Sequence, residues 1–242
     1  MPNELIWNGH SCFIIKSQGQ TLVIDPFFEG NPKAVISAKS LGKIDYVLVT
    51  HDHGDHIGQA LDICLDTGAK LLGVVETCHK LNQQGLPQDQ TVNGIGINIG
   101  GTVSLGPAKA TMIQAEHSSD SGRPAGYILT LGNGYTIYHA GDTGLFGAMG
   151  IYGKLFRIDL ALLPIGGVFT MDPRQAAVAC KLLRCRQVIP MHWGTFPMLE
   201  KGTTGFSAAL DDLGVDCRLV PCQPGQSIGL EEPLPGQDCA CP

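Results

Sequence analysis

The segment His51-Asp52-His53-Gly54-Asp55-His56 constrains this chain more than any other part of its sequence. It follows directly on the run Tyr46-Val47-Leu48-Val49-Thr50, whose length and β-branched residues are typical of a buried strand. Imidazole and carboxylate groups suit zinc, manganese or iron, and the segment has no cysteine for a structural thiolate site. A strand that ends in such a cluster predicts a hydrolase that uses two metal ions.

The spacing within this segment predicts two groups of ligands. In an extended chain His51 and His53 project on the same side, so both can reach one ion. Asp55 and His56 lie beyond Gly54, which lets the backbone turn sharply, and they can reach a second ion. The alternative is a polar loop whose histidines cluster by chance, or a His-rich surface tract with no defined ion.

Apolar runs in the first third of the chain predict several strands and one helix. The helix is expected over residues 57–66, where apolar side chains recur at helical spacing before Gly68 ends it. Strands are expected at Leu5 to Trp7, Cys12 to Ile15, Thr21 to Ile24 and Leu71 to Val75.

The rest of the chain predicts a second half of similar design. Short runs broken by glycine from residue 90 to residue 141 predict an antiparallel meander, with Asn133-Gly134 as a tight hairpin turn. Strands at Leu160 to Pro164 and Gln187 to Pro190 then alternate with helices near Pro173 to Leu183 and Phe206 to Leu213. The two halves predict an α/β fold, a four-layer αββα sandwich of two mixed β-sheets with helices outside.

Length and composition agree with one cytoplasmic domain. The chain has 242 residues, 43% of them hydrophobic, and we expect a single domain over residues 1–230 and a flexible tail over residues 231–242. Nine scattered cysteines, an odd number, indicate reduced thiols, and the tail pair Cys239 and Cys241 alone does not complete a metal site. No run approaches the roughly 20 apolar residues that cross a bilayer, so no membrane partner is expected.

The charge distribution argues against nucleic acid as a partner. The chain has 22 acidic and 16 basic residues, a formal net charge of −6, and no cluster of lysine and arginine. Binding to phosphates needs clustered positive charge. We therefore expect a small-molecule substrate, and a homo-oligomer is compatible with the sequence.

Three further candidate ligands lie where later strands are expected to end. Two metals need roughly ten coordination positions, more than the first four side chains supply. His117, Asp142 and His192 each follow an apolar run and precede a loop that contains glycine or serine. One such residue alone could be an ordinary loop residue, but three in the same situation predict additional ligands.

With these residues the chain resembles the metallo-β-lactamase superfamily, from about residue 4 to about residue 229. Within that superfamily it is most similar to small metal-dependent hydrolases related to the L-ascorbate-6-phosphate lactonases. Besides the segment at 51–56, the similarity rests on Gly9-His10-Ser11, Ile24-Asp25-Pro26-Phe27, Pro124-Ala125-Gly126-Tyr127, residues 138–144, Leu163-Pro164-Ile165-Gly166 and Ile189-Pro190-Met191-His192.

The resemblance implies a role for each of the seven candidate ligands. The first metal would be bound by His51, His53 and His117. The second would be bound by Asp55, His56 and His192, with Asp142 bridging the two ions.

Other residues are expected around the metals. Asp25 ends an apolar strand, where a carboxylate needs a partner, so we expect it to accept a hydrogen bond from a ligand imidazole, or else to form a turn before Pro26. His10 is either a substrate contact or proton donor, or a packed core histidine. His139 is expected to support the ligands rather than to bind a metal.

Three residues are weaker candidates for contacts with the substrate. Arg123 is a candidate clamp for a phosphate or carboxylate group, with an exposed surface position as the alternative. Trp193 and Phe169 flank strand ends, where we expect core packing, with an apolar wall for the substrate as the alternative.

The function predicted from the sequence is hydrolysis by a hydroxide that two divalent metals hold and that Asp55 orients. Zinc is the expected metal, with manganese or iron as alternatives. The expected substrate is a small polar ester or lactone. The alternatives are a phosphodiesterase or ribonuclease of the same superfamily, or a non-hydrolytic metal or redox module.

Overall fold

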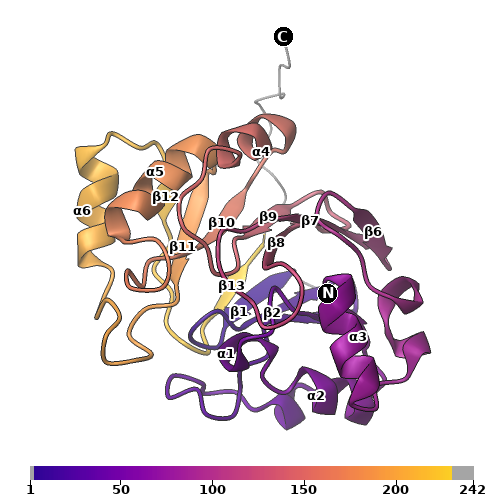
Figure 1. Cartoon of the computed structure of the whole chain (residues 1–242). Coiled ribbons are helices and arrows are strands. Elements are labelled where there is room, and N and C mark those ends of the chain that lie inside the picture. The colour runs from indigo at the N-terminus through magenta and orange to yellow at the C-terminus, as the bar shows by residue number, and fades with distance from the viewer. Residues whose placement is uncertain (1–2, 231–242) are drawn as a thin grey trace.

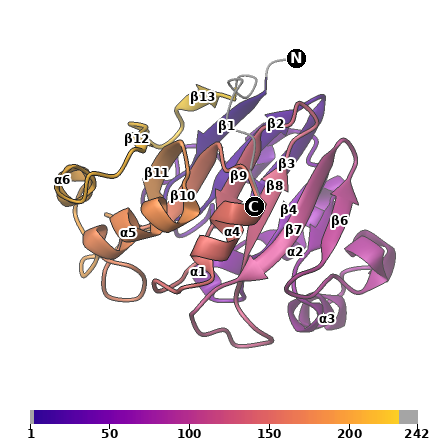
Figure 2. The same ribbon diagram turned by 90° about the horizontal axis from the view of Figure 1, so that it is seen from above.

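Two β-sheets packed face to face, with helices on both outer faces, form the described part of the protein (Figures 1 and 2). The computed structural model describes residues 3–230. The predicted tail, with its two cysteines, lies outside the described residues. The predicted αββα sandwich is confirmed.

The first sheet is built mainly from the N-terminal part of the chain. Its strand order is β13-β1-β2-β3-β4-β5, with β3, β4 and β5 parallel to one another and the other pairs antiparallel. The strands are β1 (Glu4–Trp7), β2 (Phe13–Ser17), β3 (Gln20–Ile24), β4 (Tyr46–Leu48), β5 (Lys70–Leu72) and β13 (Ser227–Gly229).

Both faces of this sheet are buried, which explains why its strands read as continuous apolar runs. Alternate side chains on each strand point to opposite faces. On β2, Phe13 and Ile15 belong to the core between the two sheets, whereas Ile14 belongs to the core beneath the helices. On β3, Leu22 and Val23 divide between the two cores in the same way.

The second sheet has the order β12-β11-β10-β9-β8-β7-β6. Strands β6 to β9 pair antiparallel, which confirms the predicted meander, and β9 to β12 pair in parallel. The strands are β6 (Thr102–Leu105), β7 (Ala108–Gln114), β8 (Ala125–Thr130), β9 (Thr136–His139), β10 (Leu160–Pro164), β11 (Gln187–Met191) and β12 (Arg218–Leu219).

The helices cover the outer faces of the two sheets (Figure 1). Those beside the first sheet are α1 (Gly54–Ile57), α2 (Ala60–Thr67) and α3 (Val75–Gln83), and those beside the second are α4 (Met149–Leu155), α5 (Pro173–Leu183) and α6 (Thr204–Asp212). Short 3-10 turns lie at Ala38–Leu41, Gln88–Gln90 and Val92–Gly94. Within residues 3–230, no helix is long and apolar enough to cross a membrane.

The local structure differs from the predictions at three places. The helix expected over residues 57–66 is two helices, because Gly58 adopts a positive φ between α1 and α2, where an added Cβ would lie 2.2 Å from the Pro26 carbonyl oxygen. The strand expected to end at Val75 stops at Leu72, and Val75 begins α3. Helix α4 was not predicted, because glycines obscure its pattern; Gly153 lets it approach α5 closely, since a Cβ there would lie 2.4 Å from the Leu182 carbonyl oxygen.

The topology brings several strand ends to one edge of the sandwich. Strands β7, β9, β10 and β11 run in the same direction, so their carboxyl ends lie at the same edge of the second sheet. In the first sheet that edge holds the carboxyl ends of β3 and β4 and the turn between β1 and β2. The candidate site lies along this edge.

Candidate metal centre

All seven predicted ligands converge at this edge, four from the first sheet and three from the second. Their nitrogen and oxygen atoms form three overlapping groups, each with its atoms within 4.8 Å of one another. The groups are His51, His53 and His117; His51, His56 and Asp142; and His10, Asp55, His56 and His192.

Asp142 lies at the centre of the cluster. It follows β9, and its Oδ2 lies 2.9 Å from His192 Nε2, 3.3 Å from His56 Nε2 and 3.7 Å from His117 Nε2. The carboxylate and the His56 and His192 side chains are buried. One carboxylate that faces imidazoles from both ligand groups has the position that a bridging ligand requires.

His51, His53 and His117 form the more exposed group. His51 Nε2 lies 3.0 Å from His53 Nδ1, and the His117 ring lies 5.1 Å from His51 and 5.2 Å from His53, centre to centre. Ligand atoms about 2.1 Å from one tetrahedral zinc lie roughly 3.4 Å apart. The 3.0 Å between His51 Nε2 and His53 Nδ1 is close to that separation. His51 and His53 lie in the segment after β4, and His117 lies in the loop after β7.

Asp25 fixes the orientation of two of these imidazoles. Its Oδ2 accepts hydrogen bonds from His56 Nδ1 at 2.7 Å and from the Thr50 hydroxyl at 2.7 Å, and its Oδ1 accepts one from Thr50 N at 2.8 Å. Since the Thr50 hydroxyl donates to Asp25, it accepts from His51 Nδ1, which lies 3.1 Å away. Both histidines therefore keep Nε2 as the atom that faces the cluster, the usual arrangement in a carboxylate–histidine–metal site.

His10 is buried and contacts a candidate ligand. Its Nε2 lies 3.1 Å from Asp55 Oδ2, and its Nδ1 lies 3.0 Å from the Thr195 hydroxyl. An ionised Asp55 can only accept, so Nε2 carries the proton and Nδ1 accepts from Thr195. Burial lowers the pKa of His10 to about 4, which keeps the ring neutral. No pattern in the sequence indicated a role for Thr195, which lies three residues after His192.

Three residues of the site have unusual backbone conformations. His10, Asp25 and His192 have φ values of 53°, 47° and 59°, in the left-handed region that residues other than glycine seldom adopt. Such residues cluster at functional sites, where the surrounding structure holds them in place. Here the His192 amide donates to the His10 carbonyl oxygen at 3.1 Å, so two of the three residues hold each other.

Electrostatics favour a cation at the centre of the cluster. Burial opposes ionisation of Asp142 and Asp25, but the neighbouring imidazoles outweigh it, so the pKa of Asp142 is well below its usual value and that of Asp25 is lowered. Burial also disfavours a charge on His56, yet Asp142 and Asp25 outweigh it and raise the His56 pKa well above its usual value. Without a metal, therefore, a proton on His56 lies between two carboxylates, where a cation would be stabilised.

The cluster passes a second test as a metal site. Within residues 3–230, His56 Nε2 and Asp142 Oδ1 are buried without a well-aligned hydrogen bond, although His56 Nε2 lies 3.3 Å from Asp142 Oδ2. Such an arrangement costs free energy unless another group satisfies both atoms. Burial and the nearby His56 lower the pKa of His51 to about 3, so its ring is neutral, as metal binding requires. The residues present therefore fit divalent metal ions.

Asp52, which was not singled out as a site residue, holds the loop that follows His117. Its carboxylate accepts hydrogen bonds from the Ser119 hydroxyl at 2.6 Å, from the backbone amides of Asp120 and Ser121, from the Ser121 hydroxyl and from Lys80 Nζ. Burial alone would raise the pKa of Asp52, but Lys80 and the two hydroxyls outweigh burial and lower it. The position of Asp52 between His51 and His53 was the one feature of the sequence that could have indicated its role in the site.

His139 lies apart from the cluster. It is buried on β9, accepts a hydrogen bond at Nδ1 from Gly141 N and donates from Nε2 to the Ser11 carbonyl oxygen. These bonds tie the β1–β2 turn to the segment that leads to Asp142.

Arg123 and the two aromatic candidates are not members of the cluster. Arg123 is exposed, and no hydrogen bond or ion pair within residues 3–230 joins it to the seven ligands. Trp193 donates to the Pro190 carbonyl oxygen, and its ring contacts Trp7 at 5.5 Å and Lys33 at 4.7 Å. Core packing was wrong for Phe169, which is 54% exposed because it lies in the loop after β10.

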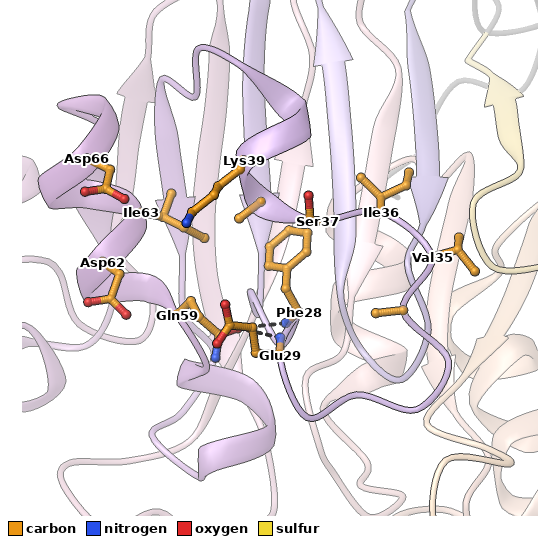
Figure 3. A pocket seen from close by; sticks show the side chains of 12 residues that line it. Phe28, Glu29, Val35, Ile36, Ser37, Lys39, Gln59, Asp62, Ile63 and Asp66 are labelled. Atoms are coloured by element: carbon orange, nitrogen blue, oxygen red, sulfur yellow. Dashed lines mark hydrogen bonds between the residues drawn. The ribbon is translucent and has the colours of Figure 1, made fainter.

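Neither of two hollows on the protein is lined by any of the seven ligands. One of about 450 Å³ is lined by the loops after β10 and β11, including Gly166, Val168 and Met198, and a Cβ at Gly166 would lie 2.8 Å from His192 Nδ1. The other, of about 530 Å³, lies between α2 and residues 28–39 and contains none of the seven ligands (Figure 3). There Gln59 accepts hydrogen bonds from the amides of Phe28 and Glu29, which holds that loop against α2.

The fold and the cluster together define a metal-dependent hydrolase of the metallo-β-lactamase superfamily. A family model described as the Beta-lactamase superfamily domain matches residues 20–193, and the chain belongs to that family. A UPF0173 metal-dependent hydrolase of Nitratidesulfovibrio vulgaris (strain Hildenborough) is 57% identical over 241 residues, 100% of both chains. The relative LI0883 of Lawsonia intracellularis is 48% identical and covers 95% of this chain and 100% of its own. Among solved structures, Igni18, a metallo hydrolase of Ignicoccus hospitalis, has a TM-score of 0.86 at 38% identity and covers 96% of this chain and 99% of its own.

Proposed function

We propose that this protein hydrolyses a small ester or lactone at a centre of two divalent metal ions. The observation that carries the proposal is the position of Asp142, whose Oδ2 lies within 4 Å of imidazoles from both ligand groups. His51, His53 and His117 would hold one ion, and Asp55, His56 and His192 the other, with Asp142 shared. Zinc is the proposed metal, with manganese or iron as alternatives that the same ligands accept.

Bound metals would lower the pKa of a water molecule toward neutrality and would polarise the bond to be cleaved. The side chains of the protein supply the orientation. The chain of hydrogen bonds from Thr195 through His10 fixes Asp55 Oδ2. Asp55 Oδ1 has no hydrogen-bond partner within residues 3–230 and is the atom that would orient the attacking water or accept its proton.

The surroundings of the cluster support a small substrate without a polyanionic backbone. The hollow beside His192 has a volume of about 450 Å³, which is within the range of pockets for small molecules. Its lining combines apolar Val168 and Met198 with charged Asp172, Glu200 and Lys201. The net charge of −6 argues against a nucleic-acid substrate. Uncharged or weakly charged carboxylic esters and lactones fit these constraints best.

The test is hydrolysis of a panel of acyl lactones and aryl esters, measured beside bis-aryl phosphodiesters. We expect turnover of a lactone or ester that ceases on chelation and returns when zinc is added. Asp55→Ala should lose at least about a hundredfold in kcat, the usual size of a general-base contribution, whereas Asp62→Ala, an exposed aspartate on α2, should keep full activity.

Three results would contradict the proposal. Full activity of the metal-free protein would exclude a metal-dependent reaction. Turnover of phosphodiesters only would favour the phosphodiesterase alternative. A coloured diiron centre that takes up oxygen and hydrolyses none of the panel would favour the redox alternative.

A further inference from the structure

Three cysteines converge far from the His/Asp cluster. Cys180 is on α5, Cys185 follows that helix, and Cys217 precedes β12. Their sulfur atoms all lie within 4.8 Å of one another, and Cys185 Sγ lies 3.5 Å from Cys217 Sγ. All three are free thiols. Cys180 and Cys185 are buried in the core, and Cys217 is partly exposed.

The local fold explains why these three side chains meet. Arg184 ends α5 in a left-handed conformation with φ 52°, which turns the chain so that Cys185 Sγ returns to 3.8 Å from the Cys180 carbonyl oxygen. Strand β12 pairs in parallel with β11, and the Arg218 amide donates to the Arg186 carbonyl oxygen. That bond places Cys217, the residue before Arg218, beside Cys185.

The spacing of the sulfur atoms matches a metal site with three thiolate ligands. With zinc–sulfur bonds of about 2.3 Å, two thiolates on one tetrahedral ion lie roughly 3.8 Å apart. Cys185 Sγ and Cys217 Sγ lie 3.5 Å apart, close to that value, and Cys180 Sγ lies within 4.8 Å of both, so the three sulfurs are near the spacing that one ion requires. The partial exposure of Cys217 provides a route for the ion and a place for water as a fourth ligand.

Charge favours a divalent ion at this position. Three thiolates with Zn²⁺ carry a net charge of −1, whereas with a monovalent ion such as Cu⁺ they carry −2, which costs more in an apolar core.

We propose that Cys180, Cys185 and Cys217 form a second metal site that binds one zinc ion through three thiolates and one water. Binding releases the thiol protons of the three cysteines to solvent and changes no oxidation state. The site lies at the opposite end of β11 from His192: seven residues separate Cys185 from His192, roughly 20 Å along an extended strand. The ion therefore has a structural role, joining the end of α5 to the edge strand β12, and takes no part in the reaction.

The test uses the full-length protein, stripped of metal under reducing conditions and titrated with Co²⁺. Thiolate ligands give bound Co²⁺ an intense charge-transfer band in the near ultraviolet, which His and Asp ligands do not give. We expect this band in the wild type and also in the His51→Ala/His192→Ala double variant, in which the other centre is broken. In the double variant, added Zn²⁺ should abolish the band at about one equivalent.

Variants of the cysteines distinguish this site from other thiols. Cys217→Ser and Cys185→Ser should each weaken Co²⁺ binding by about tenfold or more, whereas Cys222→Ser, a buried cysteine outside the cluster, should not. A Cys239→Ser/Cys241→Ser double variant should also keep the band.

Any of four results would overturn the proposal: no band in the wild type, undiminished affinity in both Cys217→Ser and Cys185→Ser, loss of the band in the tail double variant, or a Cys185–Cys217 disulfide in protein alkylated directly on cell lysis. None of these measurements depends on hydrolysis, so the thiolate site and the proposed function fail separately.

Discussion

Replacement of Asp52 by alanine should destabilise the protein and weaken its binding of metal. The carboxylate joins the hexapeptide that holds His51 and His53 to the loop that follows His117. No hydrogen bond or ion pair within residues 3–230 joins its carboxylate to the seven ligands, and its side chain is fully buried. The substitution therefore tests whether the loop anchored by Asp52 positions His117.

The expected magnitude follows from what each donor loses. Lys80 is 34% exposed, so water can replace its ion pair at little cost. The hydroxyls of Ser119 and Ser121 have other acceptors nearby, the Ser121 carbonyl oxygen at 3.0 Å and the Thr77 hydroxyl at 3.4 Å. The amides of Asp120 and Ser121 lose a charged acceptor, at about 1 to 2 kcal/mol each. We expect the free energy of unfolding to fall by about 2 to 4 kcal/mol.

The assay is urea unfolding of the metal-free protein, combined with zinc binding measured by competition with a chelating dye. Zinc affinity should fall by about 10- to 100-fold, the usual effect of removing a group that orients a ligand. Asp62→Ala, on the exposed face of α2, should change the unfolding free energy by less than about 0.5 kcal/mol. If Asp52→Ala matched this control in both measurements, the assigned role of Asp52 would be wrong.

Three further predictions concern the same edge of the sandwich. Because Lys80 and the hydroxyls lower the pKa of Asp52, the contribution of the carboxylate to stability is present above the pKa of an unfolded aspartate, about 4, and is lost below it. Urea unfolding should therefore give a difference in unfolding free energy between wild type and Asp52→Asn that is constant from pH 8 to 5 and shrinks below about pH 4. Zinc binding should release about one proton from His56, seen by calorimetry in buffers of different ionisation enthalpy, and a binding heat that did not depend on the buffer would contradict this. Gly166→Ala should lower zinc affinity measurably, because its Cβ would lie 2.8 Å from His192 Nδ1. Gly202→Ala is the suitable control, since there is open space around it, whereas Gly167→Ala is unsuitable because the φ of 88° strains any side chain at that position.

The sequence was sufficient for the architecture because the strands of both sheets carry a strong pattern. Runs such as Phe13 to Ile15 are apolar on every residue since both faces of the sheet are covered. Helix α5 was equally clear, because Asp172 and Gln175 form a capping box and Pro173 occupies the first turn. Where glycine serves close packing, as at Gly153 in α4, the same pattern was lost.

The site also contains residues that could be predicted from the sequence and residues that could not. The seven candidate ligands could be chosen from the sequence because each is a His or Asp in a short polar segment that follows an apolar run. The residues that orient them could not all be found, because their role depends on contacts between distant segments. Thr195 and His10 are 185 residues apart, and Asp52 meets Ser119 across 67 residues. Asp25 could be found from its position, because a carboxylate at the end of a buried strand costs free energy unless it has a partner.

The origin of the ligands links the metal centre to the packing of the two sheets. His51, His53, Asp55 and His56 come from the first sheet, and His117, Asp142 and His192 come from the second, so the ligand set is complete only when the sheets are docked. Tyr127 of β8 strengthens that docking, because its hydroxyl donates to the Val49 carbonyl oxygen at 2.7 Å, two residues before His51. Since an ion that binds only the docked state stabilises that state, metal affinity and the free energy of packing between the sheets are coupled quantities.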